Sequence, residues 1–128
     1  MRKLSRILFL FWIITLTSFS CKEEDAPPCA CGIENPQENL EWLNHILQLS
    51  FCAEIHSIQF QGQEYIGIYD CDDPDTYDYG CVFYDCSGNL FCQYIGFTGQ
   101  WDCSDEFKEA IKKKVLIYKQ KTNTYWDE

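Results

Sequence analysis

Basic residues are scarce in this chain. Its 128 residues include 10 Lys and Arg against 20 Asp and Glu, which gives a formal net charge of −10 and a sequence pI near 4.5. Because a nucleic-acid backbone is bound by clustered Lys and Arg, this balance argues against a nucleic-acid partner. Residues 1–20 carry Arg2, Lys3 and Arg6 and no acid, so the charge without them is −13. Such a surface attracts cationic partners or divalent ions.

Several motifs of catalysis and metal binding are missing as well. Histidine occurs twice, at His45 and His56, and a hydrolytic triad has no support beyond the presence of the residue types. The chain has no Cys-x-x-Cys pair, so neither a zinc knuckle nor a thioredoxin-like redox site is indicated. We therefore predict that the protein is not an enzyme, and we assign no catalytic residue, metal centre or cofactor.

The chain also has no apolar run long enough to predict a membrane-spanning helix. The longest run, residues 7–16, has about ten apolar positions, whereas a spanning helix needs roughly 20. Three basic residues precede it, a pattern typical of the first part of a signal peptide. Ser18 and Ser20 supply the small residues that signal peptidases prefer before a cleavage site. We predict that residues 1–20 are a signal peptide; an uncleaved anchor is the weaker alternative.

Cys21 follows the predicted leader directly and resembles the cysteine of a bacterial lipobox, although Ser18 stands where a lipobox usually has Leu. In lipoproteins this thiol receives a diacylglyceryl group, so the mature chain begins on a lipid anchor. The number of cysteines favours the same interpretation, because nine minus a lipidated Cys21 leaves eight that can all pair. Ordinary signal-peptidase cleavage before Cys21 is the alternative.

The residues after Cys21 bear on location. Lys22-Glu-Glu-Asp25 resembles the acidic export signal of surface lipoproteins of the Bacteroidota type; a solvated spacer is the simpler interpretation. We predict a lipidated tether over residues 21–28 and a protein anchored in the outer membrane at the cell surface. The folded part is predicted as one disulfide-rich domain over residues 29–128.

Eight further cysteines are candidates for disulfide bonds, as expected in an exported protein. They are Cys29, Cys31, Cys52, Cys71, Cys81, Cys86, Cys92 and Cys103. Their number allows too many connectivities for assignment. Two pairings fit the local sequence: Cys71 with Cys81 across an acidic loop, and Cys86 with Cys92 across a hairpin.

The hydrophobic pattern predicts an α+β fold. Asn35 and Pro36 are typical of a helix start, and apolar residues at helical spacing extend the predicted helix over residues 36–50. Strands are predicted at 55–60, 65–69, 80–85, 90–95 and 115–118, with a hairpin turn at Gly88-Asn89 and a second helix capped by Ser104. We expect a small antiparallel sheet of four to five strands packed with two helices.

These segments also carry a resemblance. Cys31-Gly-Ile-Glu-Asn-Pro36 and the Cys86-Ser-Gly-Asn89 turn, with Cys92, Cys103 and Phe107, resemble a family of small Bacteroidota surface lipoproteins that has no assigned function. The resemblance implies an exported, lipid-anchored, single-domain protein. It implies no catalytic residue.

Candidate ligand-binding residues concentrate between the second predicted strand and the acidic loop that follows it. If Ile66 and Ile68 face the core, the two tyrosines of that strand face outward, and outward Tyr beside Asp is common chemistry for binding sugars and proteins. Oxygen-rich loops also bind Ca²⁺, although this loop departs from the EF-hand pattern. A solvated turn is the alternative. The candidates are Tyr65, Tyr69, Asp70, Asp72, Asp73, Asp75, Tyr77 and Asp78.

Two classes of function follow. The first is a non-catalytic binding module for a glycan, a divalent ion such as Ca²⁺ or a cationic protein, including an inhibitor of a basic enzyme. The second is a structural or accessory subunit of an outer-membrane complex with no ligand of its own.

Overall fold

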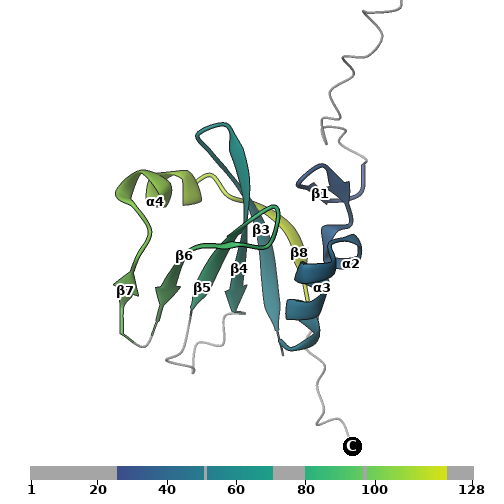
Figure 1. Cartoon of the computed structure of the whole chain (residues 1–128), viewed down its shortest axis with the longest axis horizontal. Helices are drawn as coiled ribbons and strands as arrows, with labels where there is room; N and C mark the ends of the chain where they lie inside the picture. The colour runs from purple at the N-terminus through teal and green to yellow at the C-terminus, as the bar shows by residue number, and fades with distance from the viewer. Residues whose placement is uncertain (1–25, 51, 71–79, 97, 121–128) are drawn as a thin grey trace, which may run out of the picture.

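The computed structural model describes residues 26–50, 52–70, 80–96 and 98–120. Its main element is a six-stranded antiparallel sheet in the order β7-β6-β5-β4-β3-β8 (Figure 1). A two-stranded sheet pairs β1 (Cys29–Ala30) with β2 (Ile33–Glu34). The predicted antiparallel α+β architecture is confirmed, but the predicted numbers of strands and helices were too low.

The main sheet is a meander that the last strand completes from the opposite side. β3 (Ala53–Phe60), β4 (Gln63–Asp70), β5 (Cys81–Asp85), β6 (Leu90–Ile95) and β7 (Gln100–Trp101) pair in sequence order. The chain then returns through α4 (Asp105–Ile111) to β8 (Val115–Lys119), which pairs with β3. The predicted closing strand is therefore confirmed, and its neighbour is the first strand of the meander.

The predicted helix over 36–50 is interrupted. It consists of α2 (Pro36–Asn39) and α3 (Glu41–Gln48), separated by Leu40, which has an extended backbone (φ −92°, ψ 108°) and a side chain buried in the core. The Asn44 side chain donates to the carbonyl of Gln37 at 3.1 Å, which satisfies one of the acceptors that the short α2 leaves open. Asn35 occupies the capping position with φ 48° and makes no side-chain cap, contrary to prediction.

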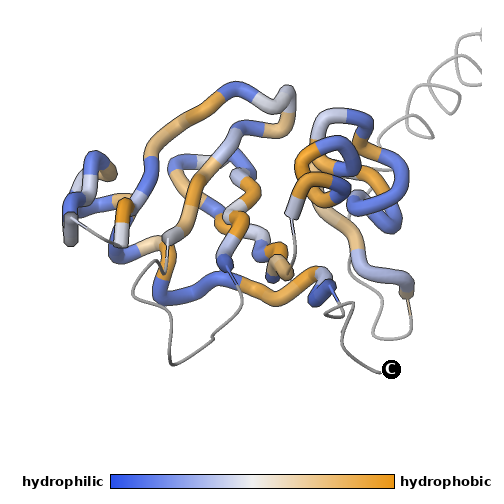
Figure 2. Tube along the Cα trace, turned by 90° about the horizontal axis from the view of Figure 1, so that it is seen from below, coloured by the Kyte–Doolittle hydropathy of each residue, from blue (hydrophilic) through white to orange (hydrophobic). Residues whose placement is uncertain are grey.

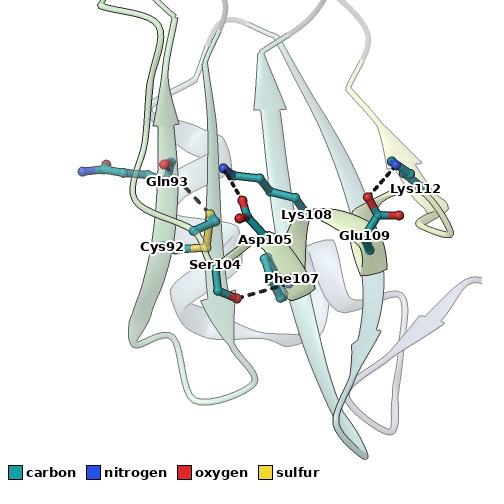
Figure 3. Close-up of polar contacts among 9 residues, drawn as sticks. Cys92, Gln93, Ser104, Asp105, Phe107, Lys108, Glu109 and Lys112 are labelled. Carbon is teal, nitrogen blue, oxygen red and sulfur yellow. Dashed lines mark hydrogen bonds and ion pairs between the residues drawn. A yellow bond between two sulfur atoms is a disulfide. The ribbon is translucent and has the colours of Figure 1, made fainter.

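The start of α4 agrees with the sequence. Ser104 Oγ accepts a hydrogen bond from the Phe107 N–H at 3.2 Å, the predicted N-cap (Figure 3). Figure 3 also shows the ion pairs Lys108–Asp105 (3.2 Å) and Lys112–Glu109 (2.6 Å) along the helix. All four of these charged side chains are at least one-third exposed, so each pair adds little stability.

Helices lie against both faces of the sheet. Under α4, Phe107 and Ile111 join a cluster with Ile58, Tyr65, Tyr69 and Phe83, and under α3, Leu43 and Leu47 join one with Ile55, Ile66 and Ile68. The coil of α2 and α3 has a hydrophobic side toward the strands and a hydrophilic side away from them (Figure 2). The expectation that Tyr65 and Tyr69 face outward is therefore wrong, because the alternate faces of β4 are both covered. Within the described residues, no helix has the length and hydrophobicity to cross a membrane.

Disulfides tie these layers together. Cys31 of the β1–β2 turn is bonded to Cys86 of the β5–β6 turn, and Cys92 of β6 is bonded to Cys103 just before α4. The predicted Cys86–Cys92 pairing is therefore wrong. Cys29 and Cys52 are also disulfide-bonded.

Cys81 is a free, buried thiol, so its predicted pairing with Cys71 is wrong too. Because Cys81 is itself unpaired, an odd number of cysteines no longer argues for a lipid on Cys21. The lipobox-like position of Cys21 is the remaining support for that prediction.

Candidate functional site

A groove of about 400 Å³ opens where α3 ceases to cover the sheet. The helix packs through Leu43 and Leu47 on β3 and β4, while β5 and β6 continue beyond it on the same face. The groove therefore lies between the C-terminal half of α3 and the strands β4, β5 and β6. Its lining residues are Ile46, Ser50, Ile68, Asp70, Gly80, Cys81, Val82, Tyr84, Gln93, Tyr94, Ile95 and Gly96.

The lining is mostly apolar, with a few polar groups. Ile46 and Val82 are half-buried, and Ile95 is 44% exposed, so apolar side chains remain accessible to a ligand. The Gln93 side chain points away from α4 (Figure 3) and makes no hydrogen bond to the described residues. An apolar concavity with few polar groups is the usual form of a binding site.

Trp42 positions one side of the groove. Its ring lies 5.3 Å from that of Tyr84, centroid to centroid, and its indole N–H donates to the carbonyl of Cys86 at 3.3 Å. The Cys31–Cys86 disulfide fixes the same turn. Tyr84, which lines the groove, is therefore held in place by an aromatic contact and by a nearby disulfide.

The charge of the groove is negative at one end. Asp70 and Gly80 both line it, and the Asp70 N–H donates to the Gly80 carbonyl at 3.2 Å. The acidic residues between these two positions lie outside the described residues, but both ends of their segment are at the groove. None of the lining residues that the structure describes is Lys, Arg or His.

Of the eight predicted ligand-binding residues, only Asp70 is shown to line this groove. Tyr65 and Tyr69 are 8% and 6% exposed and lie in the core under α4, on the opposite face of the sheet. The other five predicted residues, Asp72, Asp73, Asp75, Tyr77 and Asp78, lie outside the described residues. Sequence reasoning missed the apolar lining from Ile46, Val82 and Ile95. The alternation of side chains along 81–85 and 90–95 was the signal available for the last two.

Glu64 and two clusters of cysteines with acidic residues lie outside the groove, and their contacts hold the fold together. Glu64 accepts hydrogen bonds from the Cys31 N–H at 2.7 Å and from the Ser57 hydroxyl at 2.5 Å, which fastens the β1–β2 turn to the main sheet. Two sets of residues bring possible metal ligands together, Cys31, Glu64 and Cys86 in one and Cys92, Asp102 and Cys103 in the other. The cysteines of each set are joined in a disulfide, so they offer no thiolate to a metal.

Comparisons with protein-family models, with curated proteins and with solved structures find no match to this chain.

Proposed function

We propose that this protein is an exported, lipid-anchored, non-catalytic binding domain whose groove holds a segment of a cationic protein. The observation that carries the proposal is the groove itself, an accessible apolar concavity with an aspartate at one end and no cationic lining residue. The leader, the lipobox-like Cys21 and the acidic stretch after it are the sequence features that support export and anchoring.

Charge distribution favours a cationic ligand over a glycan. No Lys or Arg occurs between residues 23 and 107, a range that includes every residue lining the groove. A basic side chain of the ligand would be attracted to Asp70 and to the acidic residues that follow it in the sequence. An apolar side chain next to it in the ligand would be stabilised by burial against Ile46, Val82 and Ile95. An inhibitor of a basic envelope or host enzyme is one form of this function.

Calorimetric titration of the mature protein with lysozyme as a basic probe tests the ligand class. We expect binding that weakens as salt is raised, because screening reduces attraction between exposed charges. An acidic protein of similar size is the control and should not bind. Absence of lysozyme binding at low salt would contradict the proposed ligand class and favour an accessory subunit without a ligand of its own.

Variants locate the site. Asp70→Asn and Val82→Ser should each weaken lysozyme binding by about tenfold, equivalent to 1.4 kcal/mol. The matched controls Asp105→Asn, at an exposed position of α4, and Leu49→Ser, 74% exposed outside the groove, should leave binding unchanged. Equal losses in the groove variants and the controls would show that lysozyme binds elsewhere.

Intact mass of the protein extracted from membranes tests the anchor. We expect the mass of a diacylglyceryl group and an acyl chain on a chain that begins at Cys21. An unmodified mature mass, or membrane retention that persists in Cys21→Ser, would contradict lipidation.

A further inference from the structure

The lysines of the folded region come late in the chain, and four of them follow the end of α4, in the turn and in the edge strand β8, whereas Lys108 lies over Trp101 of β7. After a stretch without Lys or Arg from residue 23 to residue 107, five lysines follow within α4, the next turn and β8. They are Lys108, Lys112, Lys113, Lys114 and Lys119. Since acids outnumber bases twofold in the whole chain, this edge has a sign opposite to that of the rest.

β8 is an edge strand of the six-stranded sheet. It pairs with β3 on one side and ends the sheet on the other (Figure 1). Among the described residues, no backbone hydrogen bond beyond the β3–β8 ladder involves residues 115–118. Val115 and Leu116 are 60% and 52% exposed and, as successive strand residues, lie on opposite faces. An added strand would therefore find both hydrogen-bonding groups and apolar contacts.

The lysines select against one kind of partner strand and for another. Two copies of β8 paired antiparallel would bring Lys114 of each copy toward Lys119 of the other, and like charges facing across a ladder destabilise the pair. Lysines on edge strands commonly prevent such self-association. A strand with acidic residues at its ends would be attracted by the same lysines that repel a second copy of β8.

The lysines differ in whether their ammonium group already contacts an acidic side chain or an aromatic ring. Lys112 pairs with Glu109 at 2.6 Å, Lys119 pairs with Glu54 at 2.8 Å, and Lys114 lies 5.4 Å from the centre of the Tyr69 ring. Lys113 is exposed and has no ion pair among the described residues. Lys113 is therefore the cation most available to a partner.

We propose that β8 is a docking edge for an extended acidic peptide segment of another protein, which adds a seventh strand to the sheet. Main-chain hydrogen bonds to residues 115–118 supply affinity, and acidic side chains beside Lys113 and Lys114 supply specificity. Apolar side chains in the middle of the segment cover Val115 and Leu116. The partner segment needs about five residues, roughly 17 Å of extended chain. The groove and its ligand have no part in this proposal.

Three fluorescein-labelled peptides test it by fluorescence anisotropy with the mature protein. They are Glu-Glu-Val-Thr-Val-Glu-Glu, the same peptide with alternate backbone nitrogens methylated, and Lys-Lys-Val-Thr-Val-Lys-Lys. We expect the acidic peptide to bind and both others to bind at least about tenfold more weakly, because one cannot complete the ladder and the other has the wrong charge. Equal binding of the methylated peptide would overturn strand addition.

A pair of lysine variants locates the site. Lys113→Glu should weaken the acidic peptide about tenfold. Lys108→Glu, which makes the same charge change on α4 beside the Trp101 ring, should not. Equal losses in both variants would overturn the proposed position. Two further results would overturn the partner class. One is that vesicles of phosphatidylglycerol and phosphatidylethanolamine bind the protein in a way that depends on Lys113, while the acidic peptide does not bind. The other is that the protein sediments as a dimer and that Lys113→Glu dissociates this dimer.

Discussion

His56 is a histidine that folding keeps neutral. It is 8% exposed, its Nε2 lies 3.3 Å from Glu54 Oε2, and its Nδ1 has no hydrogen-bond partner among the described residues. Burial lowers the pKa of His56 below its ordinary value of about 6.5, and the Glu54 hydrogen bond opposes this without overcoming it. The unfolded state therefore binds the proton more readily than the folded state does.

This predicts a loss of stability on acidification that begins near pH 6.5. With the folded-state pKa depressed, the unfolded chain takes up more protons as the pH falls, so the free energy of unfolding decreases until folded His56 is itself protonated. The pKa of Glu54 is also lowered, chiefly by its hydrogen bond to Lys119, and its contribution is lost only at still lower pH. Urea unfolding at several pH values measures the effect.

Two glutamine variants provide the comparison. His56→Gln should remove the part of the pH dependence between pH 7 and 5.5, whereas His45→Gln, on the exposed side of α3, should keep it. A His56→Gln protein with the parental slope would show that other groups cause the acid sensitivity.

Cys81 should be unreactive while the protein is folded. Burial raises the pKa of its thiol to about 11, against an ordinary value of 9.0, so the thiolate fraction at pH 8 falls by about a hundredfold. Iodoacetamide treatment followed by peptide mapping should find Cys81 unmodified in the native protein and modified in urea. Rapid native modification would mean that the β5 end of the core opens readily.

At the scale of single elements, the β5–β6 turn depends on a helix far away in the chain. Gly88 has φ +85°, and a Cβ placed there would lie 2.7 Å from Cγ of Trp42, which belongs to α3. Gly62, in the β3–β4 turn, has a similar φ of +75° but no atom within 4 Å of such a Cβ. The two glycines share a backbone requirement and differ in their neighbours.

We predict that Gly88→Ala destabilises the protein more than Gly62→Ala, by about 1–3 kcal/mol, which is the usual cost of overpacking. Backbone strain is common to both variants and cancels in the comparison. Urea unfolding measures the two free energies, and Trp fluorescence reports the displacement of Trp42. Equal losses would mean that Trp42 moves aside without cost.

Local signals explain which elements could be predicted. The Ser104 cap and the Gly88 hairpin depend on neighbouring residues, and both were read correctly. Leu40, which divides the first helix, has an extended backbone and a buried side chain, and no local pattern in the sequence reveals this interruption. The β1–β2 hairpin turns at Cys31 and Gly32, both with positive φ, but its two-residue strands are too short for any alternation to be visible.

The candidate site was harder to predict than the fold. Its shape comes from a helix that packs on β3 and β4 and leaves β5 and β6 beside it, so Ile46 and Ile95 line one groove although they are distant in sequence. Alternation along 65–69 places Tyr65 and Tyr69 on the face opposite Ile66 and Ile68, but it cannot show that α4 covers this second face as well. Among the predicted site residues that the structure describes, Asp70 lines the groove, and its place at the start of the acidic loop was visible in the local sequence.

At the scale of the whole molecule, the two disulfides that join described residues to each other close loops of different length. Cys31–Cys86 spans 55 residues of sequence and Cys92–Cys103 spans 11, and the two loops do not overlap. Loop-closure entropy predicts stabilisation of about 4 kcal/mol for the first and about 3 kcal/mol for the second.

The double variants Cys31→Ala with Cys86→Ala and Cys92→Ala with Cys103→Ala test this ranking by urea unfolding without reductant. We expect the larger loss for the first pair, which also links the β1–β2 sheet to the turn beside the groove. The opposite order would show that local contacts around α4, and not loop length, dominate.

The order of strands in space differs from their order along the chain in one place, and this constrains how the molecule assembles. The meander from β3 to β7 pairs neighbours in sequence, so each strand can dock as soon as it emerges. The free side of β3, however, stays without its neighbour until residues 115–119 have been synthesised and α4 has crossed back. The pairing of strands across that distance is slow relative to local hairpins. The last pairing to form in the sheet is therefore the one between β3 and β8. β3 is an interior strand of the finished sheet, but it remains an edge strand until β8 has been synthesised.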